Sequence, residues 1–469
     1  MSKISLMMDT GKRSMANSQT ALQTVGHNIA NKSTEGFSRQ RVELQSNVPV
    51  GEGHLQIGTG SRAAQVTRVN NPYLEKQIQK EGAQSGFLEA RAEAMSRVEQ
   101  IYNEQANKGL SHYMGEFFNA FRELSNYPES APTRTLVRET GQVLANDFKR
   151  VSKDLVAVQE DLDGQVNTHV EEINQITKEI ATLNEKISAI EIQGIPANDQ
   201  RDRRDLLIKK LNENIDISWG ENEVGQVSIT AAKNAILVSG FTAQELSSKH
   251  SGNGDRVDVY FKTSAGQLTP ITKMISGGKL GAILQTRDKT IEEFKDNVDT
   301  LAFTFSNEVN KIHQQGIDLV GRPGQAFFSE LKDIKGAASR MTLSESLRGD
   351  VNRVVTAMKE KGVADNTVAN VIANLQDQTI LQDGTSTMDD FYRSSVGKIG
   401  VLAQRAIKES ESQKNILGQL NNLRESISGV SLDEEATKMI EYQKSFDASA
   451  RLIRTADEMF DTVLSLKRL

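Results

Sequence analysis

The sequence predicts a mainly α-helical protein with a small inserted β domain, paired helices at its two ends and a long helical bundle as its body. Three observations lead to this prediction. Apolar residues recur every seven positions at both ends of the chain, and long stretches between them have helical periodicity. Between Ile215 and Ile271 the apolar period changes to two, which is typical of strands.

The C-terminal stretch from Ser428 to Leu469 carries an unbroken heptad pattern. At about 1.5 Å per residue its helix would be roughly 50 Å long, too long for an ordinary small core to cover. It therefore needs a partner along its whole length. Large apolar residues occupy one seam, namely Leu432, Met439, Phe446, Ile453 and Phe460. Mostly small or polar residues occupy the predicted second seam, namely Ala436, Gln443, Ala450, Asp457 and Leu464.

The N-terminal stretch from Met8 to Ile29 repeats the pattern and offers that partner. Ser18 and Val25 lie on its second seam. A single amphipathic helix of this kind more often faces an ordinary core, but matching heptads at both ends favour a terminal pair. We predict that the apolar surface left over by this pairing packs against neighbouring subunits. The predicted assembly interface consists of Met8, Met15, Leu22, Val25, Ile29, Leu432, Met439, Phe446, Ile453, Phe460 and Leu464.

Composition excludes several kinds of partner and site. The formal net charge is −6 and the pI is near 5.7, so neither nucleic acid nor an anionic membrane surface is expected to bind. The chain has no cysteine, which excludes disulfides and thiolate metal sites. The run from Ile4 to Met8 is too short for a signal peptide, and no stretch approaches the roughly 20 apolar residues of a membrane span.

Helical periodicity dominates the rest of the chain. Helices are expected from Pro72 to about Val158, from Phe148 to Ile192, from Ala282 to His313 and from Met388 to Ile427. We predict three domains. Residues 1–35 with 430–469 form a terminal coiled-coil domain, residues 36–195 with 282–429 form an elongated helical body with short strands, and residues 196–281 form the inserted β domain.

No pattern of residues indicates an enzyme, a cofactor or a metal ion. Asp199, Asp202 and Asp205 share one helix face with nearby arginines, which predicts ion pairs on a solvated surface in place of catalytic carboxylates. The 6 histidines are scattered, and His169 on an apolar seam is expected to be structural. Glycine-rich segments match neither a dinucleotide fingerprint nor a phosphate-binding loop.

Three motifs carry a resemblance to a known family. The run ALQTVGHNIANKSTEGFSRQR, from Ala21 to Arg41, resembles the N-terminal signature of flagellar rod, hook and hook-associated proteins. The tail after Ser428 resembles the C-terminal signature of the same proteins, with Phe446 where they often have tyrosine. The run from Asn198 to Leu207 is similar to a motif of the hook-associated protein 1 family.

This resemblance implies a flagellin-like axial architecture and a structural role at the junction between hook and filament. It further implies self-assembly into a ring, contacts with the hook protein and a second junction protein, and a flagellar export chaperone on the C-terminal helix. The implied location is extracellular, in the flagellum, after type III export without a cleavable signal. Before assembly we expect the two ends to be loosely ordered, because their apolar stripes would be exposed.

Three alternatives remain. Another flagellar axial protein, such as flagellin or the second junction protein, shares the terminal signatures but is disfavoured by the Asn198 to Leu207 motif. A coiled-coil signalling protein would account for the helices but not for the motif from Phe37 to Arg41 or for the β domain. An enzyme is the least supported, since no catalytic motif is present.

Overall fold

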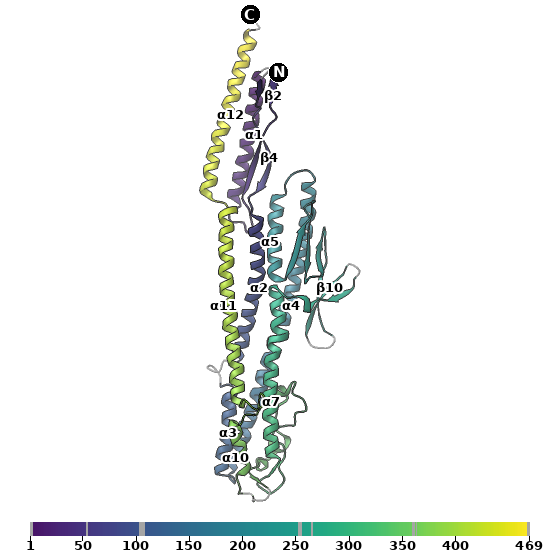
Figure 1. Cartoon of the computed structure of the whole chain (residues 1–469), viewed down its shortest axis with the longest axis vertical. Coiled ribbons are helices and arrows are strands. Elements are labelled where there is room, and N and C mark those ends of the chain that lie inside the picture. Colours follow the sequence, from purple (N-terminus) through teal and green to yellow (C-terminus); the bar gives the residue numbers. More distant parts are fainter. Residues whose placement is uncertain are drawn as a thin grey trace.

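The computed structural model describes residues 3–52, 55–102, 108–251, 256–263, 266–358, 362 and 364–466. The chain forms a long rod of helices in which both termini lie at the same end (Figure 1). The predicted fold class, a mainly α-helical protein with an inserted β domain, is confirmed. Within the described ranges, no helix combines the length and apolar character needed to cross a membrane.

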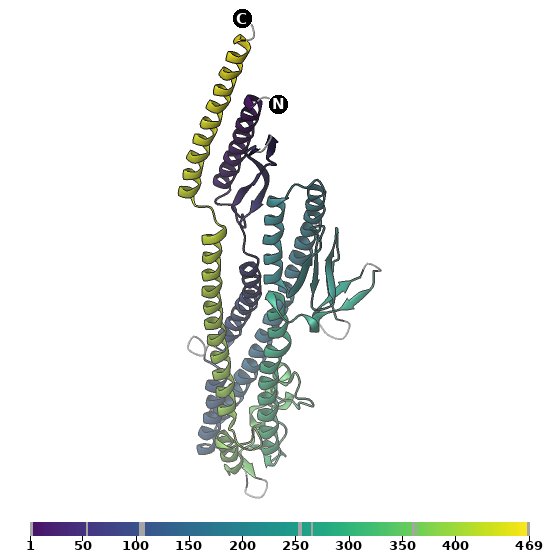
Figure 2. The ribbon, with the colours of Figure 1, turned by 45° about the horizontal axis from the view of Figure 1, so that its top comes forward.

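The first region is a terminal pair made of α1, Lys3–Ala30, and α12, Leu432–Leu466. A hairpin of β1, Gln40–Ser46, and β4, Ser61–Arg68, packs against α1, and the short strands β2, Val50–Glu52, and β3, Leu55–Ile57, extend it. Figure 2 shows this region standing apart from the rest of the rod, to which only a few connecting segments lead.

The second region is the helical body. Glu75 on α2 pairs with Arg424 on α11 and with Lys209 on α5, so α2 lies between those two helices. The body consists of α2, Pro72–Ile101, α3, Leu110–Asn126, α4, Ala131–Glu191, α5, Asn198–Asn214, α6, Gly278–Gln285, a π turn, Thr286–Thr290, α7, Ile291–His313, and α11, Met388–Ser428. Short elements fill the end away from the termini, namely β12, Gly316–Ile317, α8, Ala337–Arg340, α9, Glu345–Gly349, β13, Ala357–Met358, and α10, Thr367–Asn374.

Aromatic side chains form the core at that end of the body. The rings of Phe117 and Phe121 lie 5.0 Å apart, and those of Phe327 and Phe328 lie 4.8 Å apart. All four are fully buried, and Phe305 of α7 joins them with its ring 5.3 Å from that of Phe117. Such pairs add to the hydrophobic stabilisation of the side chains themselves. The body therefore has a complete core within one chain.

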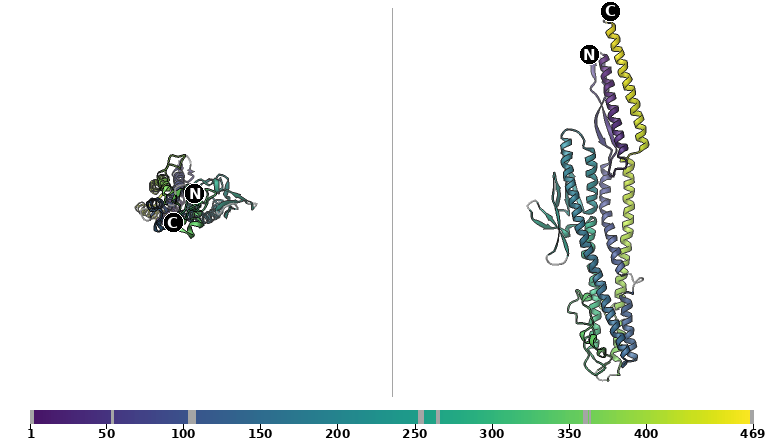
Figure 3. Two further views of the ribbon diagram at one scale, coloured as in Figure 1. Left: turned by 90° about the horizontal axis from the view of Figure 1, so that it is seen from below. Right: turned by 180° about the vertical axis from the view of Figure 1, so that it is seen from behind.

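The third region is the inserted β domain, which lies on the side of the molecule away from α11 (Figure 3). Asn184 of α4 donates to the carbonyls of Val227 and Gly240, and Asn174 exchanges two hydrogen bonds of 2.8 Å with the backbone of Leu246. These side chains fasten the strands to the helix. One sheet has the order β5, Ile217–Glu221, β6, Val227–Ala231, β7, Ala235–Ser239, and β8, Thr242–Ala243; the other has the order β11, Leu268–Pro270, β10, Val257–Lys262, and β9, Leu246–His250.

The packing groups two segments differently from the predicted domains. Strands β1 and β4 contact α1, although the sequence placed them with the body. Helix α5 packs against α2 and α4, although the sequence placed it with the β domain. The period of a segment predicts its secondary structure but not which neighbour it packs against. The division into domains that fold independently remains a prediction.

Candidate assembly interface

Helices α1 and α12 run antiparallel along one another. Residues later in α1 contact residues earlier in α12, which shows the antiparallel direction. Hydrogen bonds between side chains of the two helices fix their register. The Oγ of Ser449 donates to that of Ser14 at 2.7 Å, the Oγ of Ser18 donates to that of Ser445 at 3.2 Å, and the Nδ2 of Asn28 donates to the Oε2 of Glu435 at 2.9 Å.

Small residues form the seam between the two helices. A Cβ atom at Gly11 would lie only 2.8 Å from Cγ1 of Ile453, so the helices approach too closely there for any side chain on that residue. Gly11, Ser18 and Val25 are buried on α1, at a spacing of seven. On α12 the buried residues are Glu435, Ser449 and Ala456. Most of the large apolar side chains of the two helices are only half-buried or exposed, and Ile453 packs over Gly11.

The structure places the predicted interface residues in three groups. Val25 is buried in the seam. Seven are half-buried, namely Met8, Met15, Leu22, Ile29, Met439, Phe446 and Ile453. Leu432, Phe460 and Leu464 are exposed.

The predicted second seam of α12 is wrong by one residue. Ala436, Gln443 and Asp457 are exposed, whereas the buried positions Glu435, Ser449 and Ala456 each lie one residue before a predicted one. The reason is that the two helices approach each other closely through small residues, and this contact sets the rotation of α12 about its axis. Serines on the two helices also hydrogen-bond to each other.

The last turns of α12 extend beyond the start of α1 (Figure 1). The C-terminal end of α12 carries Met459, Phe460, Val463 and Leu464, which are 49%, 40%, 54% and 50% exposed, and we call these four residues the overhang. Spacings of three and four place these side chains on one side of the helix. The overhang is thus an apolar helix surface that the described residues of the single chain leave largely exposed.

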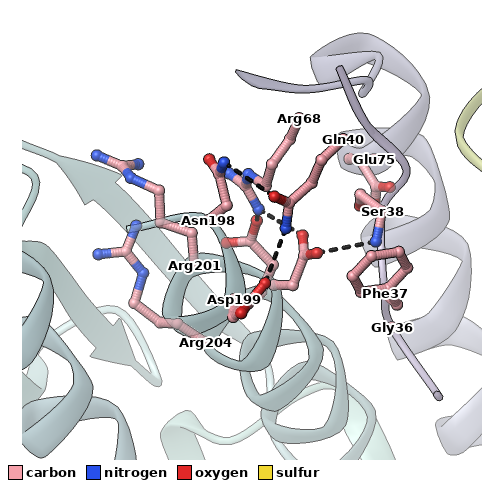
Figure 4. Close-up of polar contacts among 12 residues, drawn as sticks. Gly36, Phe37, Ser38, Gln40, Arg68, Glu75, Asn198, Asp199, Arg201 and Arg204 are labelled. Atoms are coloured by element: carbon pink, nitrogen blue, oxygen red, sulfur yellow. Dashed lines mark hydrogen bonds and ion pairs between the residues drawn. The ribbon is translucent and has the colours of Figure 1, made fainter. Parts of the chain in front are cut away.

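A polar joint connects the terminal pair to the body (Figure 4). Asp202 of α5 accepts hydrogen bonds of 2.8 Å from the backbone N–H of Ser38 and from Arg68 of β4. Arg68 also donates to Asp205, and Gln40 donates to Asp199, both at 2.8 Å. Burial raises the pKa of the Asp202 carboxyl, and Arg68 and Ser38 oppose that rise.

The prediction of a solvated carboxylate face is therefore wrong for Asp202, which is buried. Its counterion is Arg68, far away in sequence, because Arg201 pairs with Glu191 and Arg204 is itself buried against the backbone carbonyl of Gly225. Within the described residues, no group of three or more acidic or histidine side chains is placed to hold a metal ion.

A second set of contacts ties α12 to the joint. Asn28 exchanges two hydrogen bonds of 2.9 Å with the backbone of Gln40, and the backbone N–H of Arg39 donates to the carbonyl of Ser428 at 2.8 Å. The side chain of Arg39 pairs with Glu434 at 2.6 Å. These contacts join residues near the start of the chain to residues near its end, beside the polar joint.

Sequence reasoning missed Gly11, Ser14 and Asn28 of the seam and Arg68 of the joint. The seven-residue spacing of Gly11, Ser18 and Val25 was a signal for a close helix contact. No local pattern could have indicated Arg68, since its partners lie more than a hundred residues away in sequence.

Comparison with known proteins agrees with this architecture. The family model described as the flagellar hook-associated protein FlgK helical domain matches residues 95–328. Flagellar hook-associated protein 1 of Bacillus subtilis is 28% identical, with 98% of this chain and 97% of the relative covered. The protein of the same name from Escherichia coli is 26% identical, with 96% and 97% covered. The chain belongs to the flagellar hook-associated protein 1 family.

Two further comparisons concern the C-terminal end of the chain and its fold. A model described as the C-terminal part of flagellar basal body rod proteins matches residues 424–466, which include the end of α11 and the whole of α12. The solved structure of the hook junction protein from Burkholderia pseudomallei aligns with a TM-score of 0.69 at 14% identity, over 75% of this chain and 100% of that one. The chain is a structural component of the bacterial flagellum.

Proposed function

We propose that the chain forms the junction ring between hook and filament, through packing of its terminal helices against neighbouring copies and against the hook protein and a second junction protein. The observation that supports this most is the exposed overhang of α12. Its residues Phe460 and Leu464 belong to the predicted assembly interface and remain 40% and 50% exposed. The names of the relatives support the same location.

The half-buried residues of the terminal pair would add to this contact. Met8, Met15 and Met439 line the terminal pair without being covered by it. Full burial of one large apolar side chain contributes about 1.5–3 kcal/mol, so a few per subunit are enough to hold a ring together. The polar joint would set the direction in which each body leaves the ring.

The test replaces Phe460 and Leu464 together by aspartate. Both are exposed in the single chain, so the variant is expected to fold with unchanged circular dichroism and melting temperature. In flagellated cells that make only this variant, we expect it to be missing from the hook tip and filaments to be absent. Val401→Asp, which changes an exposed apolar residue of α11, is the control and is expected to assemble. Normal incorporation of the double variant at the hook tip would refute the proposal.

We further propose that the chain is exported by the type III route, and that a flagellar export chaperone covers α12 until then. The overhang supports this, because an apolar helix surface exposed in the cell invites aggregation. Calorimetric titration of the purified chaperone is expected to show at least tenfold weaker binding to the Phe460→Asp, Leu464→Asp variant than to the wild type. Equal affinity would place the chaperone site elsewhere.

A further inference from the structure

A second uncovered apolar surface lies on α11, just before the joint. Ile416, Leu420, Leu423 and Ile427 follow one another at spacings of four, three and four, the pattern of a helix seam. Ile416 is 41% and Leu423 is 49% exposed, and the other two are half-buried. We call these four residues the α11 stripe.

The composition around the α11 stripe is that of a contact surface. Residues 415–423 contain no charged side chain, although charged residues make up 25% of the whole chain. Depletion of charge is characteristic of the centre of protein interfaces. A helix face that only met water would gain solubility from charges at these positions.

A third apolar surface lies where α4 meets α5. Ile192 is 78% and Ile195 is 58% exposed, and Val224 in the turn between β5 and β6 is 50% exposed. That turn packs on the end of α4, since a Cβ atom at Gly225 would lie 2.8 Å from Oε2 of Glu191. We call Ile192, Ile195 and Val224 the α4–α5 knob.

The stripe and the knob lie on different flanks of the molecule at a similar height. Helix α2 separates α11 from α5, because its Glu75 pairs with Arg424 on one side and Lys209 on the other. Both surfaces adjoin the joint: Ser428, one residue after the stripe, accepts from Arg39, and Asp199, four residues after Ile195, accepts from Gln40. The views from front and behind show the C-terminal end of α11 and the α4–α5 connection on different sides of α2 (Figures 1 and 3).

We infer that the α4–α5 knob of one copy packs on the α11 stripe of the next copy around the ring. Two different surfaces on opposite flanks at a similar height suit a head-to-tail contact between neighbouring copies, and such a contact generates a ring when its rotation closes. This inference rests on the proposed ring, and it adds a contact between bodies that the terminal helices do not make. It also explains why both surfaces stay uncovered in the single chain.

The absence of cysteine makes a direct test possible. In flagellated cells that make only the Ile195→Cys, Leu423→Cys variant, isolated hook–filament junctions are treated with a short bis-maleimide cross-linker. We expect a ladder of covalent multimers, whereas either single variant alone gives dimers at most. The matched control pairs Ile195→Cys with Val401→Cys, another exposed residue of α11, and is expected to give no ladder.

A ladder that is absent from assembled junctions, or equally strong with the Val401 control, would overturn the inference. In that case the chain would still be present in the junction, so the proposed function would stand. Absence of the wild-type chain from the junction would instead overturn the proposed function itself.

A charge swap gives a second, independent measurement. Ile195→Asp and Leu423→Lys are each expected to reduce the fraction of cells with filaments about tenfold, and the double variant is expected to restore it. Both positions are exposed, so all three variants should fold with wild-type melting temperatures. If the double variant is as defective as the two single variants combined, the knob and the stripe do not meet.

Discussion

The body and the terminal pair differ in which apolar side chains they bury. In the body, large aromatic side chains such as Phe117, Phe305 and Phe327 are fully covered by other parts of the same chain. In the terminal pair, small residues such as Gly11 and Ser18 are buried, and most of the large apolar side chains are half-buried or exposed.

The core of the body is therefore covered within the single chain, whereas the terminal pair leaves most of its large apolar side chains half-buried or exposed. Hydrophobic stabilisation grows with the apolar area that is removed from water, and the seam removes little. Under the proposed function, neighbouring copies that cover the outer faces of the terminal helices would add to their stability. Changes in the two regions should therefore have effects of different size and kind.

The largest effect is expected from breaking the body core. Phe117→Ala removes a fully buried ring that contacts several other aromatic rings, and it should lower the free energy of unfolding by about 3–5 kcal/mol. Urea denaturation measures this loss. Phe460→Ala in the overhang is the control, and it should change stability by no more than about 0.5 kcal/mol. Similar losses in both variants would contradict the contrast between the regions.

The next effect is a loss of body stability in acid. His313 is fully buried beside Phe327, accepts a hydrogen bond from the backbone N–H of Val355, and burial lowers its pKa from 6.5 to about 4. Between these values the unfolded chain binds a proton that the folded chain excludes. The stabilisation is complete above pH 6.5, and about 3 kcal/mol of it is lost as the pH falls towards 4.

Thermal unfolding between pH 7 and pH 4 tests this, with His313→Gln as the comparison. The variant is expected to be less stable at pH 7 but to lose less stability on acidification. Parallel pH profiles for wild type and variant would show that His313 does not titrate in this way.

A smaller and local effect is expected from the seam. Gly11→Ala places a Cβ atom 2.8 Å from Ile453 and should loosen α12 by about 1–3 kcal/mol. Gly26→Ala is the matched control on the same helix, because nothing lies within 4 Å of its added Cβ atom. Hydrogen exchange is expected to accelerate in α12 for the first variant only, with the body unchanged. Equal exchange in both variants would mean that the seam tolerates wider spacing.

In the wild-type monomer, opening the pair of terminal helices should cost much less free energy than unfolding the body. Limited proteolysis is expected to trim roughly the first 30 and last 40 residues and to leave a stable helical body. Mass spectrometry of the surviving fragment measures this. Ends that resist protease as well as the body does would show that the pair is already complete without neighbours.

Much of the fold follows from local periodicity. The heptads at Met8–Ile29 and after Leu432 predicted α1 and α12, and the period of two after Ile215 predicted the strands of the β domain. The candidate interface was harder to predict from the sequence. Of its predicted residues, only Val25 lies in the buried seam, because a heptad fits a helix pair at more than one rotation.

The sequence by itself determined the type of each main element, the pairing of the two ends and the resemblance to flagellar axial proteins. Only the tertiary structure decided that Glu435, Ser449 and Ala456 form the seam, that Arg68 neutralises Asp202, and that the last turns of α12 stay largely exposed. Periodicity depends on residues that are close in sequence, so it can be recognised from the sequence alone. Burial depends on the distance and rotation between elements that lie hundreds of residues apart, which no local pattern encodes.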